Sequence, residues 1–211
     1  GYFDALLSWS RTPKPKLRDL ATALEGWSEP KGPVRWLLGG PMRRLSPWAR
    51  AVKRDMRKAR RIDLIAAYFA PNPAMLTRLD RIGRRGVARV VTAAKSDNTA
   101  TIAAARFTYR GLVKKGVQVF EYMRTKLHTK LFVIDDAVYL GSANFDMRSL
   151  YINLELMLRI EDRAFAQRMR AYVDGEIAAS ERVDAGWIAA HRGWLTRATV
   201  LDDSEPGEGR W

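Results

Sequence analysis

The chain has 211 residues, of which 47% are hydrophobic and 28% charged, a globular composition that excludes pervasive disorder and collagen-like structure. It contains no cysteine, which excludes disulfides, thiolate nucleophiles and cysteine-ligated metal centres, and its two histidines make a histidine-rich metal site a poor hypothesis. The 37 Lys and Arg outnumber the 23 Asp and Glu, and the net charge of +14 favours polyanionic partners, either nucleic acid or an anionic membrane surface.

Targeting signals are missing from the sequence. No apolar run approaches the roughly 20 residues that cross a bilayer, and the N-terminus lacks the basic and apolar segments of a signal peptide. The chain begins with Gly1 instead of Met, from which we expect a processed or partial polypeptide.

Two helices are expected before the first strand. Apolar residues at helical spacing predict them over residues 2–9 and 17–27, on either side of a Pro-rich break. Pro and Gly residues make 28–33 a linker. We therefore expect a helical prelude and linker over residues 1–33 and one domain over residues 34–200. Residues 201–211 read as a disordered acidic tail.

Helical and strand patterns then alternate. Strands are expected at residues 34–38, 62–69, 87–92, 117–122, 126–134, 138–141 and 151–160. Helices are expected at residues 47–61, 73–85, 98–115 and 165–181, with a short one after Asp184. Caps mark their starts, at Ser46 before Pro47, at Asn72, and at Asp97 or Asn98. The runs 34–38 and 62–69 are apolar enough for buried strands. This order predicts an α/β fold, a mixed β-sheet flanked by helices on both faces.

His128 and Lys130 are the residues best suited to chemistry. They lie two apart on a predicted strand, so strand alternation places both side chains on one face. An imidazole can attack phosphorus while an ammonium neutralises a non-bridging oxygen, so the pair suits a phosphate site. The alternative is a structural histidine. Asp135 has the opposite parity, which favours a structural role such as tying the following turn.

Further polar candidates follow on the next strands. Ser142 and Asn144 share a parity and could bind the same anion if their strand lies beside that of His128. Glu155 could accept a hydrogen bond from one nitrogen of a catalytic histidine, or be a surface acid. His191 lies in a short helix with no partner motif and reads as structural.

The motif His128-x-Lys130-x-x-x-x-Asp135, followed by Gly141-Ser142-Ala143-Asn144, resembles the signature of the phospholipase D superfamily. Further segments over roughly residues 34–162 resemble the C-terminal half of bacterial cardiolipin synthases: 67–72, 96–98, 116–122 and 148–155. The resemblance implies an enzyme that needs neither metal nor cofactor and forms a phosphohistidine. It implies these catalytic residues: His128, Lys130, Asp135, Asn144 and Glu155. It also implies a phosphate pocket of Lys130, Ser142 and Asn144.

Active sites of this superfamily use two such motifs, and this sequence has one. The second would lie upstream in a longer parent chain, with the prelude joining the halves, or on a second copy about a twofold axis. The expected function is transfer or hydrolysis at anionic phospholipids on the bacterial cytoplasmic membrane, held peripherally with help from the basic helix over residues 50–61. The alternatives are a homodimeric nuclease or phosphodiesterase and a catalytically incomplete binding half.

Overall fold

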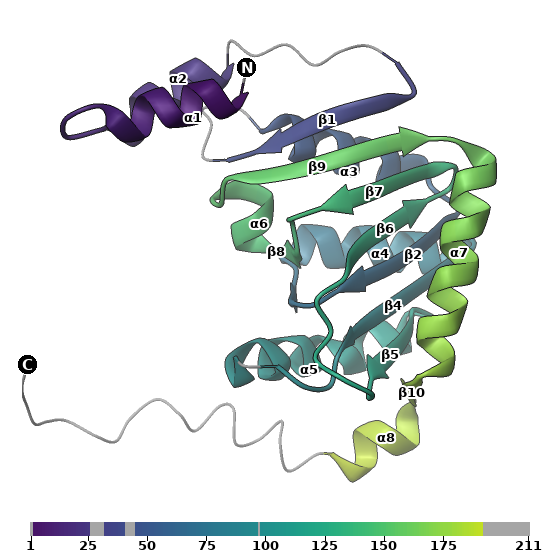
Figure 1. Cartoon of the computed structure of the whole chain (residues 1–211). Helices are drawn as coiled ribbons and strands as arrows, with labels where there is room; N and C mark the ends of the chain where they lie inside the picture. The colour runs from purple at the N-terminus through teal and green to yellow at the C-terminus, as the bar shows by residue number, and fades with distance from the viewer. Residues whose placement is uncertain (1, 26–31, 41–44, 97, 192–211) are drawn as a thin grey trace, which may run out of the picture.

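A mixed β-sheet organises the chain in the computed structural model, which describes residues 2–25, 32–40, 45–96 and 98–191 (Figure 1). Its strand order is β1-β9-β7-β6-β2-β4-β5-β10. The strands are β1 (Val34–Gly39), β2 (Arg61–Ala66), β4 (Val87–Ala93), β5 (Gln118–Tyr122), β6 (Lys130–Ile134), β7 (Ala137–Gly141), β9 (Glu155–Glu161) and β10 (Ser180–Val183). A separate two-stranded sheet joins β3 (Phe69–Ala70) to β8 (Phe145–Asp146).

The sheet has a parallel part and an antiparallel part. β2, β4 and β5 run parallel, whereas β6, β7, β9 and β1 continue from β2 as successive antiparallel neighbours. β2 lies near the centre and is almost wholly buried, as expected for a strand covered on both faces.

Helices cover both faces of the sheet, which confirms the predicted α/β sandwich. On one face lie α3 (Pro47–Lys58), α4 (Pro73–Arg85), α5 (Thr99–Lys114) and α8 (Ala185–Ala190), over the larger apolar core. In that core the Trp48 ring stacks on Phe132, with 5.5 Å between centroids. The other face packs against α7 (Arg163–Ala178), which contributes the buried Ala166 and Val173 (Figure 1).

The helices begin where the capping signals predict. The hydroxyl of Ser46 accepts the backbone N–H of Ala49 at 3.2 Å, and the side chain of Asn72 accepts that of Met75 at 2.9 Å. Between the two cap candidates of α5, Asn98 is the one seen to accept a backbone N–H; Asp97 lies outside the described residues. Such caps satisfy N–H groups that have no partner within the helix.

The predicted prelude contains two helices, α1 (Tyr2–Arg11) and α2 (Leu17–Glu25). Leu20 of α2 and Leu38 of β1 are both buried and pack together, with Leu6 and Trp9 against them. The indole N–H of Trp9 donates to the carbonyl of Lys16 at 2.9 Å and closes the turn between the helices. Most of the predicted linker and the whole acidic tail, residues 201–211, lie outside the described residues.

Two strand predictions were wrong, one in the burial of the strand and the other in its length. β1 is an edge strand with Val34 and Trp36 exposed, although its apolar sequence suggested burial. β2 ends at Ala66 instead of continuing to Phe69. A bend at residues 67 and 68 separates it from β3, and Phe69 pairs with Phe145 of β8 instead of with a strand of the large sheet.

Three boundaries also differ from expectation. β6 starts at Lys130, so His128 precedes the strand. The strand expected from residue 151 starts at Glu155, after a short helix α6 (Met147–Tyr151) that begins at the cap Asp146. The last long helix ends at Ala178, and β10, which pairs with β5, replaces its predicted final residues. In each case a cap or a distant strand pairing outweighs the local apolar pattern.

Candidate active site

The strand register brings the candidate residues to one edge of the sheet. Ala66, the last residue of β2, is paired with Lys130, the first residue of β6. At the same edge β7 ends and β9 begins, and Gly39 of β1 is paired with Glu155 of β9. Residues far apart in the sequence thus meet where five strands, each antiparallel to its neighbour, start or end.

His128 and Lys130 lie side by side, as their spacing predicted. The ammonium Nζ of Lys130 is 3.4 Å from Nε2 of His128 and donates to the carbonyl of His128 at 2.9 Å. The imidazole is exposed, whereas Lys130 is half-buried. Whether Nε2 donates or accepts depends on the tautomer of the imidazole, whereas the ammonium of Lys130 can donate to a phosphate oxygen placed beside it.

The charge of Lys130 is tuned by two opposing effects. Partial burial lowers the pKa of Lys130 below its ordinary value, because desolvation disfavours the ammonium. The carboxylate of Glu155 acts in the opposite direction and raises that pKa. Glu155 therefore lies close enough to Lys130 to influence its protonation.

Glu155 is 6% exposed and bonded to residues of the neighbouring loop. The hydroxyl of Ser142 donates to its carboxylate, and the amide of Asn153 donates to it at 3.4 Å. The Ser142 oxygen in turn accepts the backbone N–H of Leu156 at 3.0 Å. No described imidazole donates to Glu155, so its role in orienting a histidine stays a prediction.

The side chains of Asn144 and Ser142 have different partners. β7 ends at Gly141, so strand alternation does not apply to these two residues. The side-chain oxygen of Asn144 accepts the backbone N–H of Tyr68 at 3.0 Å, and its own backbone N–H donates to the hydroxyl of Ser149 at 3.1 Å. This assignment leaves the amide nitrogen as its donor. The structure does not bring Ser142 and Asn144 to one partner, and their joint phosphate-binding role stays a prediction.

A pocket of about 640 Å³ lies beside Asn144. It is bordered by the start of α5 and by the segment from β8 to α6. Its lining residues are Tyr68, Ala70, Asn98, Ala100, Thr101, Ala104, Asn144, Asp146, Met147, Arg148, Ser149 and Asn153. This pocket was not predicted from the sequence, because its walls come from segments far apart in the chain.

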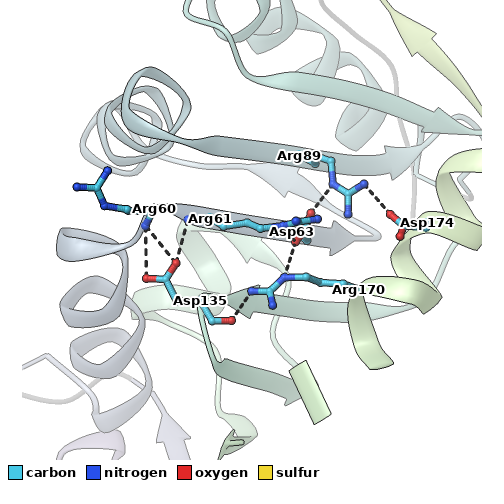
Figure 2. A network of polar contacts seen from close by, with 7 residues as sticks. All are labelled: Arg60, Arg61, Asp63, Arg89, Asp135, Arg170 and Asp174. Carbon is cyan, nitrogen blue, oxygen red and sulfur yellow. Dashed lines mark hydrogen bonds and ion pairs between the residues drawn. The ribbon is translucent and has the colours of Figure 1, made fainter. Parts of the chain in front are cut away.

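Asp135 lies at the opposite end of β6 from Lys130. Its carboxylate accepts the backbone N–H groups of Arg60 at 3.1 Å and Arg61 at 2.9 Å, and its carbonyl accepts the guanidinium of Arg170 (Figure 2). Its φ of 47° belongs to a tight turn. The structure therefore separates Asp135 from His128 and Lys130, in agreement with the structural role that its parity favoured over a catalytic one.

Asp63 forms the centre of a neighbouring ionic network that we did not predict. This fully buried carboxylate of β2 accepts from Arg61 at 2.9 Å, from Arg170 of α7 at 3.2 Å, and from Arg89 of β4 (Figure 2). Arg89 continues to Asp174 of α7 at 2.6 Å. The sequence does contain a signal for this network: Asp63 lies within an apolar strand sequence, and a buried carboxylate requires buried partners.

A second buried network lies under α5. The carboxylate of Glu121 accepts hydrogen bonds from Nε and Nη2 of Arg106, each at 2.8 Å, and from the hydroxyl of Tyr109 at 2.9 Å. Burial, together with the Glu121 charge, raises the pKa of Tyr109 well above its ordinary value. His191 stacks on Trp187 with 3.9 Å between ring centroids, and its Nδ1 lies 2.8 Å from the Trp187 carbonyl. These contacts fit the structural role expected for His191.

Two properties of the described residues concern metal ions and membranes. No group of three or more His, Asp or Glu side chains within residues 2–25, 32–40, 45–96 and 98–191 is arranged to hold a metal ion. Over the same ranges, no helix combines the length and apolarity that crossing a bilayer requires.

Comparison with known sequences identifies relatives. Residues 52–176 match the family described as cardiolipin synthase, PLD-like domain. Cardiolipin synthase B of Escherichia coli (strain K12) is 40% identical over 148 residues, which are 68% of this chain and 36% of that protein. Cardiolipin synthase A of Escherichia coli O157:H7 is 33% identical over 132 residues, 62% of this chain and 26% of that protein. The chain thus spans about a third of the length of such relatives.

Solved structures share the fold at low sequence identity. Phosphatidylserine synthase of Haemophilus influenzae Rd KW20 superposes with a TM-score of 0.63 at 14% identity, over 82% of this chain and 48% of that one. The phospholipase D family member Nuc of Salmonella typhimurium superposes with a TM-score of 0.59 at 18% identity, over 72% of this chain and 99% of that one. With the family match covering more than half of its residues, the chain belongs to the PLD-like domain family of cardiolipin synthases.

Proposed function

We propose that this chain supplies one half of an active site that transfers or hydrolyses the phosphodiester of anionic phospholipids through a phosphohistidine. The observation that carries the proposal is the pair formed by Nζ of Lys130 and Nε2 of His128, 3.4 Å apart at an open edge of the sheet. The relatives named cardiolipin synthase support phospholipid as the substrate class.

The chemistry requires two histidines. One attacks phosphorus, forming a P–N bond as the P–O bond to the leaving alcohol breaks, and the other donates a proton to that alcohol. An acceptor alcohol or water then loses its proton to the second histidine and displaces the first from phosphorus. Lys130 stabilises the charge on the non-bridging oxygens throughout. Asn144 offers an amide donor beside the pocket, and Glu155 fixes Ser142 at the site edge.

His128 occupies one of the two histidine positions, and a second phospholipase D-like domain supplies the other. That domain belongs to a longer parent chain, with residues 1–33 as the connection, or to a second copy. The superposition on 48% of the phosphatidylserine synthase chain is compatible with two such domains in one polypeptide. The superposition on 99% of Nuc is compatible with one domain per chain.

The surface near the site favours a lipid over a nucleic acid. Apolar side chains are exposed on both segments that flank it, at Met123 before His128 and at Met147, Ile152 and Leu154 before Glu155. Exposed cations stand among them: Arg124, Lys126 and Arg148. Apolar contact with cations nearby suits the headgroup region of an anionic leaflet, each cation contributing about 1 kcal/mol. The protein would thus work peripherally at the cytoplasmic membrane, with the exposed cations of α3 adding to its attraction.

The test is phosphatidyl transfer on phosphatidylglycerol vesicles, with cardiolipin and phosphatidic acid separated by mass, in an assembly that carries both motifs. His128→Asn keeps the size of the side chain yet cannot form a P–N bond or donate the proton, so turnover should fall to background. His191→Asn is the matched control and should keep wild-type turnover. Appreciable turnover in well-folded His128→Asn would refute the proposal. Cleavage of labelled single-stranded DNA in place of lipid would assign the site to nucleic acid.

A further inference from the structure

The two strands that flank β9 both end in glycine at the candidate site. Gly39 is the last residue of β1 and is paired with Glu155, the first residue of β9. Gly141 is the last residue of β7 and is paired with Met157. The first residues of β9 therefore lie between two strand ends that carry no side chain.

At Gly39 the approach of β1 to β9 is closer than a larger residue allows. A Cβ atom on Gly39 would lie 2.7 Å from the Cβ of Glu155 and 3.3 Å from its Cγ. Directly opposite residues of an antiparallel pair ordinarily keep their Cβ atoms about 4.5–5.5 Å apart. The same added atom would lie 3.4 Å from Cδ1 of Trp48. The stem of Glu155 thus occupies space that a side chain at residue 39 would need.

The two glycines exclude a side chain for different reasons. Gly141 has a φ of 155°, which side chains disfavour, and an added Cβ would also overlap the carbonyl oxygen of Leu156. Gly39 is not among the glycines with positive φ. Its backbone conformation therefore permits alanine, and the contact with Glu155 is what opposes one. This separation makes Gly39 the informative position for substitution.

We infer that Gly39 is a positioning residue, whose lack of a side chain seats Glu155 so that its carboxylate reaches Ser142 and influences Lys130. The hydroxyl of Ser142 donates to that carboxylate, and the amide of Asn153 donates to it at 3.4 Å. Both donors lie in segments that adjoin the strand ends, so they can reach Glu155 only while β9 keeps its place beside β1. The effect on turnover rests on the function proposed above, whereas the effect on Lys130 does not.

Trp48 connects this contact to the strand that begins with Lys130. Its fully buried ring stacks on Phe132, which lies two residues after Lys130 and on the same face of β6. Gly39 lies beside the same ring. The ring and the loop after β7 close two sides of the Glu155 stem, so a larger residue 39 should displace that stem outward. The carboxylate would then move away from Lys130.

The experiment follows the Lys130 ammonium in Gly39→Ala by carbon-13 NMR of the lysine Cε atoms. The pKa of Lys130 should fall, because a displaced carboxylate no longer opposes the effect of burial. In the Glu155→Gln background the same substitution should leave that pKa unchanged, since the charge that it would move is gone. In an assembly that carries both motifs, Gly39→Ala should lower kcat about tenfold and change KM less.

Gly175→Ala is the matched control. Gly175 lies in α7, and an added Cβ there meets no atom within 4 Å. This variant should keep the wild-type Lys130 pKa and the wild-type kcat, which separates the contact at Gly39 from the general effect of replacing a glycine.

A size exchange keeps the inference testable if Gly39→Ala does not fold. Glu155→Gly removes the Cβ that the added atom would meet, so Gly39→Ala/Glu155→Gly should resist urea better than Gly39→Ala alone. A double variant that is no more stable, a wild-type Lys130 pKa in Gly39→Ala, or an equal fall of that pKa in the Glu155→Gln background would overturn the inference. The expected fall of the pKa without phosphodiester turnover in any assembly would count against the proposed function alone.

Discussion

The carboxylate of Asp135 accepts the backbone N–H of Arg61 at 2.9 Å, at the end of β6 remote from Lys130. The two residues are distant in sequence, and the bond fixes the turn after β6 to the start of β2. Asp135 thereby fixes one end of the strand that begins with Lys130, while His128 and Lys130 lie at the other end.

Asp135→Ala should lower the free energy of unfolding by about 0.5–1.5 kcal/mol, because the backbone N–H groups of Arg60 and Arg61 lose their acceptor. Asp135→Asn should cost less, since its amide oxygen still accepts and asparagine tolerates a positive φ. Urea denaturation of both variants measures the effect. Asp136→Ala removes the adjacent exposed acid and serves as the control. If Asp135→Ala kept wild-type stability but lost turnover per folded molecule, Asp135 would be catalytic instead.

Asp63→Ala should destabilise the fold strongly, by about 3–5 kcal/mol, because Arg61, Arg89 and Arg170 would lose a shared buried carboxylate. Chemical denaturation monitored by circular dichroism is the measurement. Asp174→Ala removes a more exposed partner from the same network and should cost no more than about 1 kcal/mol. Similar losses for both variants would mean that the burial of Asp63 does not govern the network.

Lys130 should lose its proton at a lower pH than an ordinary lysine, because burial lowers its pKa. Binding of a phosphate group by its ammonium should accordingly weaken as the pH rises through that lowered pKa. Glu155→Gln removes the charge that opposes the effect of burial, so the pKa should fall further. Carbon-13 NMR of the lysine Cε atoms, assigned with Lys130→Met, follows both titrations. A rise of the Lys130 pKa in Glu155→Gln would contradict this electrostatic account.

Turnover should survive removal of divalent ions. The proposed steps use only histidine, lysine and solvent protons, and the described residues gather no three His, Asp or Glu side chains into a metal site. Activity of the assembled enzyme should therefore be equal before and after dialysis against EDTA. Loss of activity that one particular metal ion restores would require a different mechanism.

Local sequence predicted those features that depend on neighbouring residues. Ser46 and Asn72 cap helices where expected, and the spacing of His128 and Lys130 placed their side chains together. Prediction from local sequence failed where pairing with a distant segment determines the secondary structure. The segment that holds β10 reads as the end of a helix, yet its pairing with β5 makes it a strand.

The candidate site likewise combines contacts that local sequence predicted with contacts that depend on distant segments. Proximity of His128 to Lys130 follows from two residues of one segment, whereas the partners of Glu155 depend on the loop after β7. Parity could not place Ser142 and Asn144, because the strand ends at Gly141 and the backbone turns. The pocket beside Asn144 could not be predicted either, because its lining residues come from separate elements, which include α5, β3 and α6.

The position of β9 between β1 and β7 has a consequence for synthesis on the ribosome. β1 is synthesised before β9, and among the described strands β9 is its only neighbour in the sheet. Until β9 has been synthesised, Trp36 and Leu37 lack the strand with which they pair in the folded domain, and such late long-range pairing slows folding. Gly39 and Glu155 therefore meet only after β9 has been translated, so the sheet edge that holds Lys130 and Glu155 is incomplete in a shorter nascent chain.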